Sequence, residues 1–143
     1  MSVRIQASQV VDRPVSQVFQ FYAVEHVRNH PRWDPDIELE MITEGPMALG
    51  SRIRRINKRS GAPVEGTMEV VEFEPDRAIG MLIQDGPTEM RGRSSFDALG
   101  PAQTRVIVTV EIPSMPGSTD TGFLTGRMQR SLHNMKQLIE SES

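Results

Sequence analysis

The stretch SSFDALGPAQTRVIVTVEI, residues 94–112, contains the clearest strand pattern of the chain. Its alternate positions carry the apolar residues Val106, Val108, Val110 and Ile112. This period of two is typical of a strand with one buried face. The run Glu89–Ala98 also alternates, and only the turn sequence LGPAQ lies between it and the strand predicted over Thr104–Ile112. Such a short connection joins antiparallel neighbours, so the stretch predicts part of an antiparallel meander.

The same pattern extends upstream from this stretch. Runs that suit strands alternate with short segments that contain Gly or Pro, which favours consecutive antiparallel strands over strands separated by helices. The further predicted strands cover residues 3–12, Ile37–Thr43, Ser51–Lys58, Val64–Phe73 and Ala78–Gln84.

Two short helices are predicted between the first strand and the second. Pro14 suits the first position of a helix. The residues after it place Val15, Val18, Phe19 and Tyr22 on one helical face. We expect a second helix over Glu25–Asn29 that ends before Pro31, because a residue that precedes proline is pushed out of the α region.

A long helix is predicted near the C-terminus, with a cap at Thr119 or Asp120 and an end at about Glu140. Its apolar side chains all lie within about 40° of Met128 at 100° per residue. They are Leu124, Met128, Leu132, Met135 and Ile139. This narrow stripe would be buried if the helix lay across one face of the sheet.

Five local motifs follow one another in an order that resembles a known family. They are VDRPVSQVFQFYA, HPRWDPDIE, GSRIR, EVVEFEPDR and SSFDALGPAQTRVIVTVEI. The chain resembles the START-like helix-grip (SRPBCC) superfamily, and within it the polyketide cyclase/dehydrase and lipid-transport family. The resemblance implies one α+β domain over residues 1–143. Its seven-stranded curved antiparallel sheet would carry two short helices and grip the long C-terminal helix, with an apolar cavity between them.

Composition excludes several classes of partner. A net charge of −3 provides no basic field for a nucleic acid backbone. No apolar run reaches the ~20 residues of a membrane span, and the first residues lack the apolar region of a secretory signal, so we expect a cytoplasmic protein. The absence of Cys rules out disulfides and thiolate metal sites. Homodimerisation stays open.

Candidate catalytic groups are few. His26 and His30 are four residues apart, with Asp34 nearby, but no further ligands converge on them by sequence, so we expect no metal and a solvent-facing or capping role. His133 falls on the outer face of the last helix, where we expect a surface residue. No phosphate loop, nucleophile elbow or nicotinamide fingerprint is present, and no cofactor is expected. Ser94 and Ser95 have no His placed to activate them.

The preferred function is binding of a small hydrophobic or amphipathic molecule, such as a lipid, fatty acid or polyketide-like compound, in the cavity. Trp33 lies in a proline-flanked loop that would shape the pocket, and the methionines offer adaptable apolar walls. The predicted ligand-binding residues are Trp33, Met68, Met81, Met90, Phe96, Val108, Leu124, Met128, Leu132 and Met135.

Two other functions stay open. One is a polyketide cyclase/aromatase-like enzyme in which an inward Arg or acid would assist enolisation. The other is a chaperone-regulator-type interaction module whose cavity is filled. Whether the protein is an enzyme therefore stays undecided, and it depends on four charges in the strands. At most one of Arg52, Arg54, Arg55 and Asp85 is expected to reach the cavity.

Overall fold

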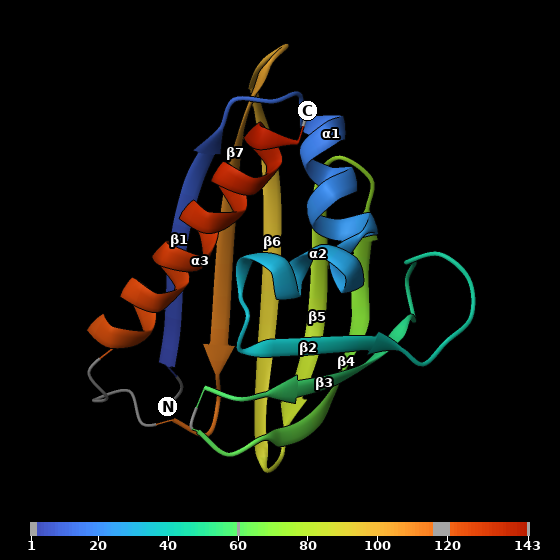
Figure 1. Cartoon of the computed structure of the whole chain (residues 1–143), viewed down its shortest axis with the longest axis vertical. Helices are drawn as coiled ribbons and strands as arrows, with labels where there is room; N and C mark the ends of the chain where they lie inside the picture. The colour runs from blue at the N-terminus through green and yellow to red at the C-terminus, as the bar shows by residue number, and fades with distance from the viewer. Residues whose placement is uncertain (1–2, 60, 116–120, 143) are drawn as a thin grey trace.

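The computed structural model describes residues 3–59, 61–115 and 121–142. Within these residues, seven antiparallel strands form one sheet in the order β1-β7-β6-β5-β4-β3-β2, and helices cover one face of it (Figure 1). The strands are β1 (Val3–Val11), β2 (Ile37–Met41), β3 (Arg52–Asn57), β4 (Val64–Glu74), β5 (Ala78–Asp85), β6 (Thr88–Gly100) and β7 (Gln103–Ile112). The helices are α1 (Val15–Phe19), the π-helical turn η1 (Gln20–Val24), α2 (His26–Trp33) and α3 (Gly122–Ser141). The predicted α+β helix-grip fold is confirmed.

The hairpin of β6 and β7 has the predicted register. Phe96 pairs with Val106, and Ser94 pairs with Val108. Phe96, Val106 and Val108 are buried on the concave face, whereas Arg93 and Asp97 are exposed on the other. β7 also pairs with β1 in the antiparallel direction, so the first and last strands of the sheet in sequence order are neighbours.

The N-terminal helices differ from the prediction in two places. The first helix widens into the π-helical turn η1, in which the consecutive residues Phe21, Tyr22 and Ala23 are all buried. Pro31 lies inside α2, so the prediction that it ends the helix is wrong. Proline removes the hydrogen bond to the carbonyl four residues earlier and crowds that carbonyl, but neighbouring bonds can keep the helix in place. The bonds from Asn29 N to Glu25 O and from Asp34 N to His30 O, each 2.9 Å, hold the helix on either side.

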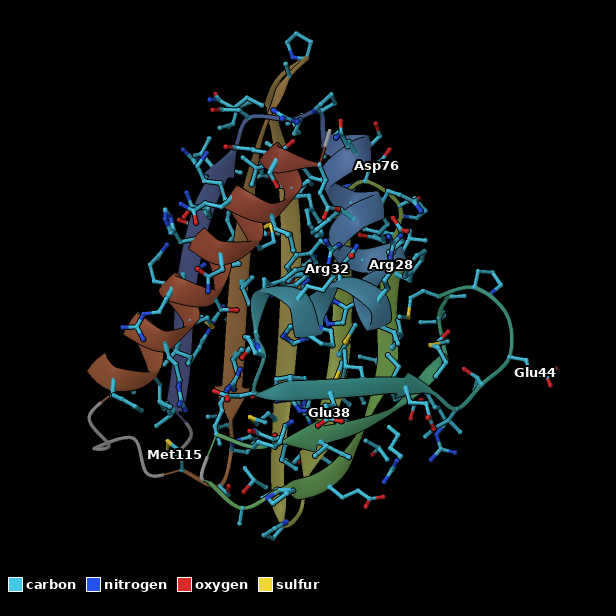
Figure 2. The ribbon with its side chains drawn as sticks, in the orientation of Figure 1. Arg28, Arg32, Glu38, Glu44, Asp76 and Met115 are labelled. Atoms are coloured by element: carbon cyan, nitrogen blue, oxygen red, sulfur yellow. The ribbon has the colours of Figure 1, made fainter. Side chains whose placement is uncertain are left out.

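The second helix, α2, is amphipathic, and its buried side anchors it. His26, Asn29 and Trp33 are buried, and the side chain of Asn29 donates a hydrogen bond to the Phe21 carbonyl at 2.9 Å. Arg28 and Arg32 lie on the face turned away from the sheet (Figure 2). This arrangement directs the His and Trp side chains of α2 towards the interior.

The long helix α3 crosses the concave face of the sheet next to β1 and β7 (Figure 1). Leu132, Met135 and Ile139 are buried in the core, whereas Leu124 and Met128 are only half-buried. The predicted caps Thr119 and Asp120 lie outside the described residues. No helix in the described part of the chain is long and apolar enough to cross a membrane.

Candidate functional site: a cavity with one polar end

A cavity of about 200 Å³ lies between the concave face of the sheet, α2 and α3. Eight of the ten predicted ligand-binding residues line it: Trp33, Met68, Met81, Met90, Val108, Leu124, Met128 and Leu132. Phe96 and Met135 do not line it. Both are buried in the core, where the Phe96 ring packs edge-on against Phe19 and Tyr22. The predicted role of these residues in binding a ligand stays a prediction.

The ring of Trp33 closes the end of the cavity that faces α2. It is 3% exposed and lies nearly parallel to the rings of Tyr22 and Phe21, with centroids 5.3 and 5.9 Å away. Trp33 is therefore both a core residue and part of the cavity wall. The aromatic stack holds its position, because three large rings share one buried layer.

The two histidines of α2 also line the cavity, so the expectation that they are solvent-facing or capping residues is wrong. α2 continues through Pro31 and turns both side chains inward. The Nδ1 atom of His26 lies 2.8 Å from the Tyr22 carbonyl oxygen. Burial, together with the nearby charges of His30 and Arg55, lowers the His26 pKa well below 6.5. Burial also lowers the pKa of His30. Both rings are therefore neutral at pH 7.

Asp34 follows the second histidine and is buried with it. Its Oδ2 atom lies 3.8 Å from His30 Nε2, and it forms an ion pair with Arg59. Burial opposes ionisation of this carboxyl group, but His30 and Arg59 outweigh that effect and lower its pKa to about 2. Asp34 is therefore ionised at neutral pH. Among the described residues, with His26, His30 and Asp34 included, no three His, Asp or Glu side chains are grouped to hold a metal ion.

A buried ion pair forms the floor of the polar end. Arg55 Nε donates to Asp85 Oδ1 at 2.8 Å, and Asn57 Nδ2 donates to Asp85 Oδ2 at 3.0 Å. Arg55 and Asp85 lie on two strands, β3 and β5, that flank β4, and Gly66 of β4 is the register partner of both. Because glycine has no side chain, the Arg55 side chain can cross above the β4 backbone to reach the carboxylate. Of Arg52, Arg54, Arg55 and Asp85, only Arg55 lines the cavity.

Tyr22 and Ser94 form a neutral polar pair in the cavity wall. Their hydroxyl oxygens are 2.8 Å apart, and both residues line the cavity. Burial raises the pKa of Tyr22, although its hydrogen bond to Ser94 opposes the rise. Tyr22 therefore stays protonated across the physiological range.

Four polar wall residues were missing from the prediction: Tyr22, Arg59, Arg127 and Ser131. Tyr22 was assigned to the helical face but not to the site. Arg127 lies 100° from Met128 around the helix, just beyond the apolar stripe, and a long side chain can bend from there over apolar neighbours. The only sequence signal for Arg127 was its place beside the apolar stripe.

Residues 2–140 match a family model described as polyketide cyclase/dehydrase and lipid transport. The chain belongs to this family. No curated protein has a sequence that matches it. The family description joins cyclases with lipid carriers, so membership alone leaves the choice between binding and catalysis open.

Solved structures with this fold come from several kinds of protein. A START superfamily protein from Mycobacterium smegmatis is 16% identical with a TM-score of 0.79, covering 98% of this chain and 99% of that one. The ZhuI aromatase/cyclase from Streptomyces sp. R1128 is 15% identical with a TM-score of 0.76, covering 98% and 94%. Norcoclaurine synthase from Thalictrum flavum, solved with dopamine and hydroxybenzaldehyde, is 12% identical with a TM-score of 0.75, covering 100% and 89%. At these identities the likeness establishes the fold.

Proposed function

We propose that this protein binds one small hydrophobic or amphipathic molecule in the cavity between the sheet and α3. The observation that supports this most directly is the open space itself. A cavity of about 200 Å³ exceeds the ~150 Å³ apolar cavity that is known to accept benzene, whereas ordinary cores leave few voids larger than a water molecule.

The composition of the wall supports the same proposal. Met68, Met81, Met90 and Met128 line the space together with Trp33. Methionine side chains are flexible and polarisable, so they can adjust to ligands of different shape. A chaperone-regulator-type module with a filled core is disfavoured, because this core is not filled.

A cyclase-like enzyme is the second candidate, because the polar end of the cavity contains acid–base groups. The neutral ring of His26 could accept a proton, and the Arg55 guanidinium could donate hydrogen bonds to a developing enolate oxygen. Only one of the four strand charges reaches the cavity, however, and it is already paired with Asp85. Ligand binding is therefore the simpler account.

The test uses N-phenyl-1-naphthylamine, a neutral dye that fluoresces in apolar sites, and a variant that fills the cavity. Gly92 lines the space, and a Cβ atom there would meet only Ile83 Cδ1, at 3.6 Å. Gly92→Leu should remove dye binding with little loss of stability. Gly100→Leu is the matched control, because a Cβ atom at Gly100 meets nothing within 4 Å and Gly100 does not line the cavity.

The proposal fails if the purified wild-type protein, freed of copurified molecules by mild unfolding and refolding, does not bind the dye. It also fails if Gly92→Leu destabilises the fold by the ~1–3 kcal/mol of an overpacked core without changing dye binding. Native mass spectrometry of the protein as first purified would identify any natural occupant by its added mass.

A further inference from the structure

The polar end of the cavity contains more cationic groups than anionic ones. Three guanidinium groups line it, those of Arg55, Arg59 and Arg127. Arg55 is paired with Asp85 and Arg59 with Asp34. His26 and His30 add no charge at pH 7, because burial lowers the pKa of both. One positive charge in the wall is therefore left without a compensating carboxylate, although the whole chain carries a net charge of −3.

The uncompensated charge belongs to Arg127. Across residues 3–59, 61–115 and 121–142 it has no carboxylate within ion-pair distance, and its recorded contact is with the exposed ring of Phe123, whose centroid lies 5.3 Å from Cζ. Asp85 cannot readily serve both arginines, since each of its oxygens already accepts a hydrogen bond, from Arg55 or from Asn57.

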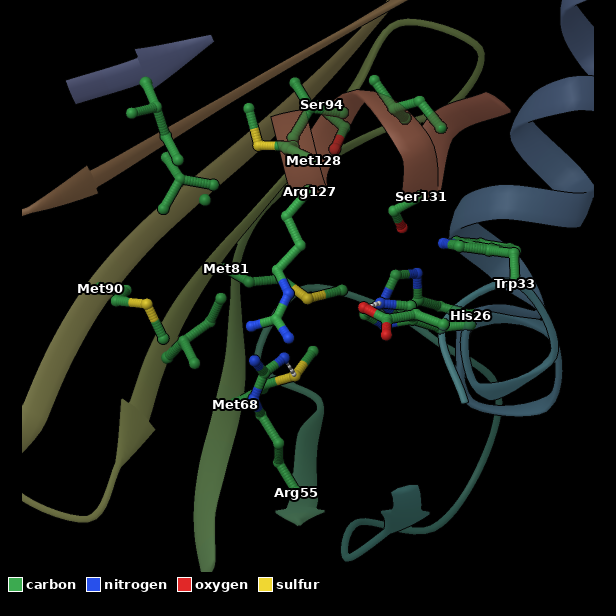
Figure 3. A pocket seen from close by; sticks show the side chains of 18 of the residues that line it. His26, Trp33, Arg55, Met68, Met81, Met90, Ser94, Arg127, Met128 and Ser131 are labelled. Atoms are coloured by element: carbon green, nitrogen blue, oxygen red, sulfur yellow. Dashed lines mark hydrogen bonds and ion pairs between the residues drawn. The ribbon is translucent and has the colours of Figure 1, made fainter. Parts of the chain in front are cut away.

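The guanidinium of Arg127 is directed into the cavity rather than away from it. Figure 3 shows the Arg127 side chain reaching in from α3 and the Arg55 side chain reaching in from β3, so that their guanidinium groups point toward one another. Two like charges that face each other across a partly dry space repel, and each prefers an anion between them. The arrangement is therefore complementary to a single negative group.

The rest of the wall is complementary to an apolar body. Met90 and Met128 lie away from His26 in the cavity wall (Figure 3), and the apolar residues Val110 and Leu124 also line the cavity. A molecule with one anionic end and one apolar end would thus match both parts of the wall at once. One uncompensated positive charge suits a carboxylate, which carries one negative charge, better than a phosphate monoester, which carries nearly two.

We propose that Arg127 and Arg55 together bind the carboxylate of a small amphipathic acid, whose apolar body lies against Met90 and Met128. This inference rests on the proposed function and narrows the ligand to carboxylic acids. A guanidinium group presents parallel N–H donors that match the two oxygens of a carboxylate, which makes arginine well suited to this role.

The experiment compares two displacing molecules that differ only at the head group, octanoate and octan-1-ol, in their competition with N-phenyl-1-naphthylamine at pH 7.5. In the wild-type protein, octanoate should displace the dye at a concentration about tenfold or more below that of octanol, because its head group forms charge-assisted hydrogen bonds. Arg127→Gln should abolish this preference by weakening the binding of octanoate, with octanol displacement measured against the dye affinity of the same variant as the reference.

Arg130→Gln is the matched control, since Arg130 lies on the exposed side of the same helix and its loss removes the same charge from the chain. It should leave the preference for octanoate intact. Circular dichroism and the urea midpoint establish that both variants are folded. A conservative Arg127→Lys variant should retain part of the preference, because it keeps the charge but loses the planar pair of donors.

The two proposals fail in different ways. If the dye does not bind at all, the proposed function is wrong and this inference falls with it. If the dye binds and octanol displaces it as well as octanoate does, the cavity is a general apolar site and the carboxylate inference alone is overturned. Equal loss of octanoate binding in Arg127→Gln and Arg130→Gln would also overturn it, because a diffuse electrostatic effect would then explain the preference.

Discussion

Arg54 and Arg55 are adjacent in β3 but lie in opposite environments. Arg54 points to the outer face of the sheet, where its Nε atom lies 3.0 Å from Glu65 and both side chains are largely in water. Arg55 points to the inner face, where it is 3% exposed and its Nε atom lies 2.8 Å from Asp85. The two ion pairs have nearly the same geometry, but water screens only the outer one.

This difference shows that the inner face contains an ion pair whose burial costs desolvation free energy. An exposed pair contributes little because solvent screens both charges. A buried pair must repay the desolvation of both groups, and well-packed apolar residues often do as well or better. If stability alone had shaped this face, an apolar pair would have served. The buried pair at the cavity floor therefore fits the proposed binding site better than a role in stability alone.

The largest effect is expected from breaking the inner pair. Asp85→Ala leaves the Arg55 charge buried without a partner and should lower the free energy of unfolding by about 3–5 kcal/mol, measured by urea denaturation. The matched change on the outer face, Glu65→Ala, should leave the urea midpoint almost unchanged.

A double variant tests the cause of that loss. Arg55→Met with Asp85→Leu should recover most of the stability that Asp85→Ala loses, because no charge then remains buried. Continued instability of the double variant would show that shape, rather than charge, dominates at this position.

A side chain at Gly66, between the two members of the inner pair, should cost about 3 kcal/mol, the upper end of overpacking. A Cβ atom there would lie 1.7 Å from the backbone oxygen of Gln84, which cannot move without disturbing the pairing of β4 and β5. Gly92→Ala is the control on the same face, since its Cβ atom makes only an ordinary contact. Equal urea midpoints for the two variants would contradict this account.

Lowering the pH should reduce the stability of the protein in two steps, which arise from His26, His30 and Asp34. The folded-state pKa values of His26 and His30 are lowered, so the unfolded chain takes up protons first and stability falls as the pH drops below about 6.5. Asp34 has a folded pKa of about 2, so its contribution of about 2 kcal/mol is present above pH 4 and is lost between about pH 4 and 2.

Urea midpoints measured from pH 7.5 to 2.5 would separate the two steps. Asp34→Asn should weaken the second step. It should also deepen the first step, because Asp34 raises the pKa of His30 against the effect of burial. His133→Gln, at an exposed position of α3, should leave both steps of the urea-midpoint profile unchanged. A stability that stays flat between pH 7 and pH 5 would mean that the two histidines of α2 are not buried in solution.

The smallest effect on the inner face is expected from Ser94→Ala. This change leaves the buried Tyr22 hydroxyl without its partner and should cost about 1 kcal/mol in the free energy of unfolding. Ser95→Ala, one residue along the same strand and on the outer face, should cost less than that. Equal costs for the two variants would show that water satisfies the Tyr22 hydroxyl in the cavity.

Periodicity was enough to predict the faces of the elements. A period of two identified the inward residues of β6 and β7, and a period of 3.6 identified the stripe of α3, because each depends on local geometry alone. The same patterns could not distinguish residues that line the cavity from residues of the filled core. Phe96 and Met135 have the same parity or helical face as residues that line the cavity, but both belong to the filled core, where Phe96 packs against Phe19 and Tyr22.

A local sequence pattern could not predict which side chains contact each other across the sheet. The sequence left open which of Arg52, Arg54, Arg55 and Asp85 points inward. The contact of Arg55 with Asp85 needs the register of three strands and the missing side chain of Gly66. The histidines were misplaced for a related reason. Pro31 was taken as a helix end, whereas the buried anchors of α2 keep it helical and carry His30 inward.

The pairing of β1 with β7 has a consequence for how the protein is made. Val3 pairs with Ile112, and α3 packs against β1, so the partners of β1 are synthesised after the five strands that lie between β1 and β7 in the sequence. Contacts this distant along the chain close slowly, because their loop entropy is lost before any pairing energy is gained. During synthesis β1 is therefore an unpaired strand with an alternating apolar face. Such a strand is prone to aggregation until β7 and α3 have been synthesised and cover it.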